Sequence, residues 1–210
     1  MRTFTLKGLF LTTVFMLLGC LAIHAADDGL ITEQVVVKLD EAGTLPDKIS
    51  ESDKYRITNL KIIGEINGTD LRLIREMAGC DSEGSETIGK LSILDLSEVQ
   101  IVKGGDYYVA FKDRDENGQE FLYAFYSSND VVDDYAFYGC SGLTSIALPS
   151  SLTSIGYYAF GWCDGLTSIE LPNSLTSIGN GVFYDCSGLT SITLPSSLTS
   201  ISEDTFNECI

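Results

Sequence analysis

The sequence predicts an α/β repeat solenoid, with one parallel sheet of about seven short strands on the concave face and an irregular or short helical convex face. The first observation is an internal repeat with a period of 23 residues, which runs without a register slip from Ala136 to Ile210. The second is that apolar residues recur in phase within this repeat. These apolar positions are too sparse for one unit to close its own core, so neighbouring units must stack on one another.

The regular repeat occupies residues 136–210 and reads AFYGCSGLTSIALPSSLTSIGYY, AFGWCDGLTSIELPNSLTSIGNG, VFYDCSGLTSITLPSSLTSISED and then TFNECI. Each unit contains an Ile-x-Leu pair, whose period of two is typical of a short strand. Proline follows each pair and ends the strand, because it has no N–H to donate. The Leu-Thr-Ser-Ile-Gly half is too short for a regular helix. We expect unusual backbone angles at Gly142, Gly165 and Gly188.

Two of the repeat columns consist of phenylalanine and cysteine. The cysteine column predicts a buried row of free thiols, one per unit, since a straight row cannot place four ligands tetrahedrally around zinc. No disulfide, metal or cofactor is therefore expected. The members of the two columns are Phe137, Phe160, Phe183, Phe206, Cys140, Cys163, Cys186 and Cys209.

The unit F-x-x-C-x-x-L-T-S-I-x-L-P-x-S-L-T-S-I resembles the leucine-rich repeats of the BspA-like family of bacterial surface and secreted proteins. The resemblance covers about a third of the chain. It implies a leucine-rich-repeat solenoid that acts in surface display and attachment. It implies no catalytic residues.

Residues 1–25 are predicted to be a signal peptide, with basic Arg2 and Lys7 before an apolar run that is too short to span a bilayer. Two cleavage sites compete. Ordinary cleavage after Ala25 is favoured. The alternative is lipoprotein anchoring through Cys20, at the end of the lipobox-like Leu-Leu-Gly-Cys. Both place the protein outside the cytoplasm, secreted or at the cell surface.

Residues 26–101 are interpreted as an N-terminal cap with irregular leucine-rich repeats, and residues 102–135 as a degenerate repeat with an inserted loop or hairpin. Further strand pairs are expected at Val37-x-Leu39, Leu60-x-Ile62, Leu94-x-Leu96 and Tyr123-x-Phe125, the last lying 23 residues before Ile146-x-Leu148.

A helix is expected between a cap at Thr69 or Asp70 and a stop at Gly79, with an apolar face that includes Leu71 and Ile74. A second short helix is expected at Pro46, which suits a first turn.

The charge and the histidine count exclude several functions. The chain carries 30 acidic and 13 basic residues, a net charge of −17 that argues against nucleic acid as a partner. Its single histidine, His24, lies in the targeting segment, so the exported protein lacks the base of a Ser-His-Asp or Cys-His system. We therefore expect no enzyme.

The segment Asp113-Arg-Asp-Glu-Asn-Gly resembles the first half of a calcium-binding EF-hand loop. The position that needs a bidentate glutamate is Ala124, between two predicted core residues. An acidic turn at Asn117-Gly118 is the better interpretation.

Binding is the remaining class of function. The residues that alternate with the core pairs should face outward from the sheet, and the inserted segment adds aromatic residues. The candidate ligand-binding residues are Lys61, Asp95, Ala147, Glu170 and Thr193 on the sheet, with Tyr107 and Tyr108 near the insertion.

A protein or glycan ligand, such as host extracellular matrix or mucin, is what the resemblance implies. The alternative is a structural or assembly module of the cell envelope. We also expect self-association through the C-terminal end, where the Phe206 and Cys209 columns would lack a polar cap.

Overall fold

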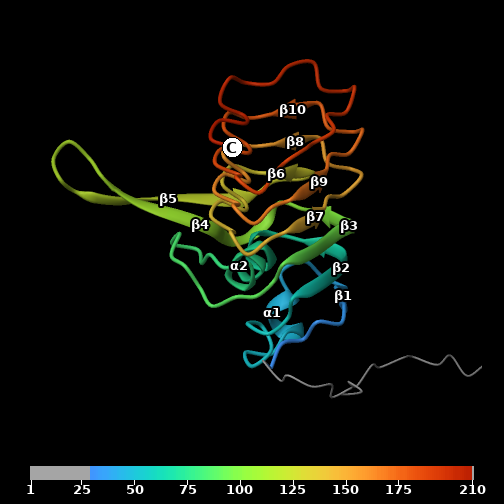
Figure 1. Cartoon of the computed structure of the whole chain (residues 1–210). Coiled ribbons are helices and arrows are strands. Elements are labelled where there is room, and N and C mark those ends of the chain that lie inside the picture. Colours follow the sequence, from blue (N-terminus) through green and yellow to red (C-terminus); the bar gives the residue numbers. More distant parts are fainter. Residues whose placement is uncertain (1–28, 210) are drawn as a thin grey trace, which may run out of the picture.

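The computed structural model describes residues 29–209. The predicted signal peptide and Cys20 lie outside the described residues. The described chain forms a stack of coils from which one hairpin projects sideways (Figure 1). No helix among the described residues has the length and apolar character needed to cross a membrane.

The main sheet is parallel and has five strands in the order β1-β2-β3-β7-β9. A bridge between Glu170 and Thr193 extends it by one position. Its strands are β1 (Val35–Lys38), β2 (Asn59–Ile66), β3 (Ile93–Ile101), β7 (Ser145–Ala147) and β9 (Ser168–Glu170).

The expected strand at Tyr123-x-Phe125 is wrong as a member of this sheet. It belongs instead to β5 (Glu120–Ser127), which pairs antiparallel with β4 (Gly104–Arg114), while β3 pairs directly with β7. The 23-residue spacing to Ile146 is a coincidence of register. A neighbouring strand joined by a short turn costs less loop entropy than a partner one coil away.

The opposite side of the regular coils is more ordered than the sequence predicts. A second parallel sheet of three strands lies there, in the order β10-β8-β6. Its strands share the 23-residue phase of Val132, Ile155 and Ile178, and are β6 (Val131–Val132), β8 (Ser154–Ile155) and β10 (Ser177–Ile178).

The first strand is paired two residues away from the expected register. Val35 lies opposite Leu60 and Val36 opposite Lys61, where the 23-residue spacing would have aligned Val37 with Leu60. Since side chains alternate with a period of two, a shift of two residues leaves every side chain on its expected face.

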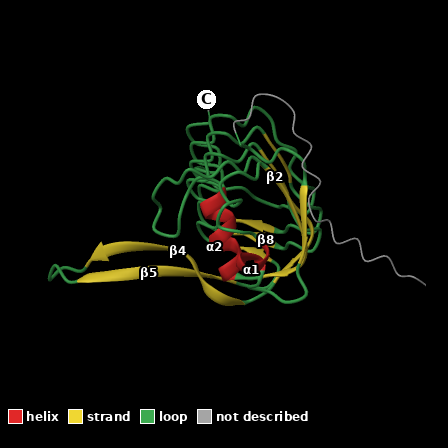
Figure 2. Ribbon diagram, turned by 90° about the horizontal axis from the view of Figure 1, so that it is seen from below, coloured by secondary structure: helices red, strands yellow, loops and turns green. Residues whose placement is uncertain are grey.

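Two helices cover the N-terminal coils on the side away from β2 (Figure 2). The short helix α1 (Leu45–Lys48) has proline in its first turn, as expected. The helix α2 (Gly68–Met77) has its N-cap at Asn67, two residues before the nearer expected cap, Thr69. Asn67 and Asp70 form a capping box, in which the side chain of each residue accepts a hydrogen bond from the backbone N–H of the other. The expected apolar face is confirmed, because Leu71 and Ile74 are buried.

The carboxylate of Asp70 also connects the two helices. It accepts hydrogen bonds from the N–H groups of Gly43 at 2.5 Å and Leu45 at 2.9 Å, as well as from Asn67 at 2.9 Å. Asp70 is fully buried, and this burial raises the pKa of its carboxyl group although the three donors oppose the shift.

The core of the regular coils is a ladder of phenylalanine rings. Phe137, Phe160 and Phe183 are buried and stack nearly parallel, with ring centroids 5.2 Å and 5.7 Å apart. The cysteine column lies beside them as free thiols, as predicted. Each thiol from the second coil onward donates to a phenylalanine carbonyl one coil back, for example Cys163 Sγ to Phe137 O at 3.1 Å.

Two threonine columns join the coils, one beside each of the two parallel sheets. The N–H and the hydroxyl of Thr167 both donate to the Thr144 carbonyl, and those of Thr176 both donate to the Thr153 carbonyl. The backbone N–H and the side-chain hydroxyl therefore donate to the same carbonyl of the preceding coil, which accounts for the threonine in both Leu-Thr-Ser segments of the repeat unit.

The expectation for the repeat glycines is wrong, because Gly142, Gly165 and Gly188 do not have positive φ. A Cβ atom on Gly142 would lie 2.8 Å from the Ala78 carbonyl oxygen, and on Gly188 2.5 Å from that of Asp164. Glycine is needed there for the close approach of successive coils.

Candidate binding surfaces

The five sheet residues predicted to share a row do so. The strand registers place Lys61 opposite Asp95, Asp95 opposite Ala147, and Ala147 opposite Glu170. Thr193 continues the row through its bridge to Glu170. The predicted alignment is confirmed, and the ligand-binding role of these residues stays a prediction.

Lys61, the cation at one end of this row, already forms ion pairs within the protein. Lys61 Nζ lies 2.7 Å from Glu98 Oε1 and 3.1 Å from Asp95 Oδ2, and these hydrogen bonds raise the pKa of Lys61. Partial burial alone would raise the pKa of Asp95, but hydrogen bonds from Ser97 and the charge of Lys61 lower it. The single cation of this row is therefore neutralised by carboxylates of the same strand neighbourhood.

The two tyrosines proposed for the insertion have different environments. Tyr108 is fully buried, and its hydroxyl donates to the Asp134 carbonyl at 2.8 Å, so its assignment to a ligand surface is wrong. Tyr108 lies in a run of three buried residues, Tyr108 to Ala110, where β4 crosses the body of the molecule. Tyr107 is half-buried, edge-on to Tyr126, with the guanidinium of Arg72 4.9 Å from its ring centroid.

The hairpin of β4 and β5 leaves the body of the molecule at Phe111 and extends well beyond the coils (Figure 1). We call residues 112–126 of this hairpin the arm. Its strands stay paired to the tip, where Lys112 lies opposite Leu122 and Arg114 opposite Glu120. Leu122, Tyr123 and, at its base, Tyr126 expose 49%, 53% and 55% of their surface.

These exposed apolar residues were missed in the sequence because Tyr123 fitted a core column. The signal that identifies them is a hairpin pattern. Two aromatic runs, YYVAF and FLYAFY, flank the polar turn DRDENG.

The tip of the arm is the acidic turn that the sequence predicts. Asp115 Oδ1 accepts from the N–H groups of Asn117 at 2.9 Å and Gln119 at 2.8 Å, and Gly118 has a φ of 78°. Ala124 pairs with Ala110 within the hairpin. The carboxylate of Asp115 thus serves the turn itself.

An aromatic cluster joins the hairpin base to the turns of the coils. Trp162 packs between Tyr138 and Tyr184, with ring centroids 5.0 Å and 4.7 Å away, and it remains 36% exposed. It is mainly a packing residue of the rim. The other members are Phe111, Phe125, Tyr135 and Tyr158.

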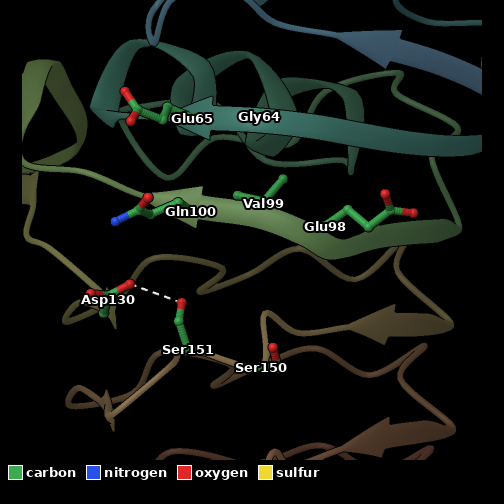
Figure 3. A pocket seen from close by; sticks show the side chains of 8 residues that line it. All are labelled: Gly64, Glu65, Glu98, Val99, Gln100, Asp130, Ser150 and Ser151. Carbon is green, nitrogen blue, oxygen red and sulfur yellow. Dashed lines mark hydrogen bonds between the residues drawn. The ribbon is translucent and has the colours of Figure 1, made fainter.

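An open groove of about 480 Å³ follows the second half of β3 (Figure 3). One wall consists of strand residues and the other of turns from later coils, in which Ser151 Oγ donates to Asp130 Oδ1 at 2.8 Å. The lining residues are Gly64, Glu65, Glu98, Val99, Gln100, Asp130, Ser150 and Ser151.

A smaller hollow of about 240 Å³ lies at the other end of the stack, beside Leu189, Ile192, Phe206 and Cys209. Self-association through these residues stays a prediction.

Short parallel strands that repeat once per coil, held by in-phase apolar columns, define a leucine-rich repeat fold. Residues 123–210 match the BspA type leucine rich repeat region in six copies. This match agrees with the resemblance stated from the sequence. Proteins of this type are typically at the cell surface or secreted, and leucine-rich repeats generally mediate protein interactions without catalysis.

Solved structures of similar proteins are also bacterial leucine-rich repeat proteins. One from Bacteroides capillosus is 32% identical, over 46% of this chain and 64% of that chain, with a TM-score of 0.35. One from T. pallidum is 33% identical, over 38% and 48%, with a TM-score of 0.32. One from Bacteroides ovatus is 22% identical, over 84% and 35%, with a TM-score of 0.43.

The chain spans less than two thirds of the length of each of these solved proteins. No curated protein matches it.

Proposed function

We propose that this chain is an exported binding protein, not an enzyme, and that it attaches to a protein or glycan of host material through its arm. The observation that carries the proposal is the exposure of Leu122, Tyr123 and Tyr126 on one projecting hairpin. Exposed aromatic side chains contribute strongly to binding when a partner covers them. An isolated two-stranded hairpin also gains stability from such a partner.

The sheet row is the secondary contact in this proposal. Ala147, Glu170 and Thr193 offer a methyl group, a carboxylate and a hydroxyl without a large aromatic anchor, so we assign them a supporting role. The described residues contain no histidine, which supports a role in binding over acid–base catalysis.

The test is a binding screen of the purified chain on immobilised matrix proteins, mucins and a glycan array. We expect saturable binding that the double variant Tyr123→Ser and Tyr126→Ser weakens by at least about tenfold. Tyr157→Ser is the matched control, because Tyr157 is equally exposed (54%) but lies on the coils. Equal loss in the control and the arm variant would contradict the assignment to the arm.

The screen also separates the two classes of binding function. Absence of binding across the whole panel, combined with co-purification with envelope components of the producing cell, would replace attachment by the assembly role.

A further inference from the structure

The stack contains one incomplete level, at the second half of β3. Strand β3 has nine residues, but β7 pairs with only the first three, Ile93–Asp95. On the side of β3 that faces β7, residues 96–101 receive one backbone hydrogen bond from the described chain, donated by Asp130 N to Ile101 O at 2.9 Å. Residues 96–100 therefore form a free strand edge inside the molecule's main sheet.

The short length of β7 leaves this gap, because β7 ends at Ala147, just before Leu148 and Pro149. The chain itself leaves the sheet after Ile101, forms β4 and β5, and returns at Val131 to join the other sheet as β6. No strand of the described chain therefore lies beside residues 96–100 on this side. The groove of about 480 Å³ occupies that position, between β3 and the turns that carry Asp130 and Ser151 (Figure 3).

The backbone of β3 directs hydrogen-bonding groups into this groove. Successive residues of a strand point their N–H and C=O groups to opposite sides. Since the carbonyl of Ile101 points toward Asp130, the N–H and C=O of Val99 point to the same side. A register shift between β2 and β3 leaves both Ser97 and Glu98 exposed, which marks a bulge in the first part of this edge.

The walls of the groove are acidic. Three carboxylates line it, from Glu65, Glu98 and Asp130, and none of the lining residues is basic. Glu98 is shared with Lys61, whereas Glu65 is exposed and has no salt bridge within residues 29–209. Ser150 and Ser151 add hydroxyl groups. These charges favour a cationic occupant.

We propose that this groove binds an extended, basic peptide segment of a partner protein, which adds to the free edge of β3 as a strand. Main-chain hydrogen bonds to an exposed sheet edge supply affinity in such complexes, and side-chain charge supplies selectivity. The inference rests on the proposed binding function. Because the groove and the arm are different surfaces, an experiment can refute the assignment of one without refuting that of the other.

The test uses three synthetic heptapeptides and isothermal titration with the purified chain. The first is acetyl-Lys-Thr-Lys-Val-Lys-Thr-Lys-amide. The second carries an N-methyl group on the central valine, which removes one backbone donor and keeps the charge. The third replaces every lysine by glutamate. We expect the first to bind, the second to bind at least about fivefold more weakly, and the third not to bind.

Protein variants locate the site. Glu65→Gln and Asp130→Asn should each weaken the basic peptide about twofold to fivefold at low salt. Glu203→Gln, a remote exposed control, should leave its affinity unchanged. Hydrogen exchange of the Val99 amide should slow when the basic peptide is bound.

Two results would overturn the proposal. One is no binding of the basic peptide, and the other is equal affinity for the N-methylated peptide, which would show charge attraction without strand addition. The double variant Tyr123→Ser and Tyr126→Ser should keep full peptide affinity. Failure of the unmodified chain to bind any surface in the screen, with peptide binding retained, would therefore refute the role of the arm and leave the groove proposal intact.

Discussion

The stacked coils and the arm are both rich in aromatic residues, yet they use them in opposite ways. In the coils, Phe160 lies between Phe137 and Phe183 and is fully buried. In the arm, the ring centroids of Phe121 and Tyr123 lie 4.8 Å apart, and Tyr123 stays half-exposed. The difference is that Phe160 has a neighbouring coil above and below it, whereas no second layer of the described chain covers the arm. Aromatic content alone does not decide burial; a second surface must close over the ring.

The strand β4 shows both situations within one element. Tyr108, Val109 and Ala110 are buried where the hairpin crosses the body of the molecule, and every residue from Lys112 to the tip is exposed. The transition occurs at Phe111, whose ring contacts Tyr135 and Tyr138 of the first regular coil.

The largest expected effect concerns thiol reactivity. Burial raises the pKa of Cys140 and of Cys186 to about 12, so at about pH 8 their thiolate fraction is roughly 1,000-fold below that of an ordinary thiol. We expect iodoacetamide to alkylate them at least that much more slowly than a cysteine introduced on the arm by Tyr123→Cys. Mass spectrometry over time measures both rates.

The same shift fixes the sign of a pH effect on stability. Because the folded pKa exceeds the unfolded value near 9, the buried thiols favour folding below about pH 9 and lose this contribution toward pH 12. Similar alkylation rates for Cys186 and the arm cysteine in the folded protein would contradict the buried ladder.

The next effect concerns ring removal. Phe160→Ala should lower the free energy of unfolding by about 3–5 kcal/mol, since it leaves a cavity between two stacked rings. Tyr123→Ala on the arm should change it by less than about 1 kcal/mol. Urea denaturation of both variants measures the difference. Equal losses would show that the arm is packed in solution and would remove the contrast.

The smallest effect concerns glycine. A Cβ atom at Gly165 would collide with the Ser141 carbonyl oxygen of the preceding coil, so Gly165→Ala should cost about 2–3 kcal/mol. Gly118 at the arm tip has open space around it and a φ of 78°, so Gly118→Ala should cost only about 1 kcal/mol of backbone strain. Thermal unfolding of the pair checks this order, and a reversed order would contradict the close approach of the coils.

The sequence predicts the regular coils well because each apolar column recurs several times at the 23-residue spacing. A single chance match in spacing therefore does not decide the assignment. The phase of Phe160 and of Cys163, and the row that ends at Glu170 and Thr193, follow from spacing alone. The face of α2 follows from helical periodicity around Ile74.

Spacing fails where only one instance exists. Tyr123 sits at the correct distance for a sheet strand, but a local antiparallel partner competes with a distant parallel one, and periodicity does not rank the two. The groove beside Val99 could not be predicted either, because the repeat spacing does not give the length of β3. For Gly142, Gly165 and Gly188 the repeat predicts that glycine is required. It does not distinguish between the two possible reasons, a positive φ and the lack of space for a Cβ atom.

The doubled threonine bonds have a mechanical consequence. When tension is applied to the two ends of the chain, nearly identical bonds hold Thr144 to Thr167 and Thr153 to Thr176, so successive coils should yield at similar forces. Each released coil of 23 residues adds roughly 75–80 Å of extended chain. The hairpin lies in the path of this load, since the chain enters it at Gly104 and leaves it at Ser127, which are paired with each other. Its paired strands must therefore separate before it adds length, whereas the regular coils add length one at a time.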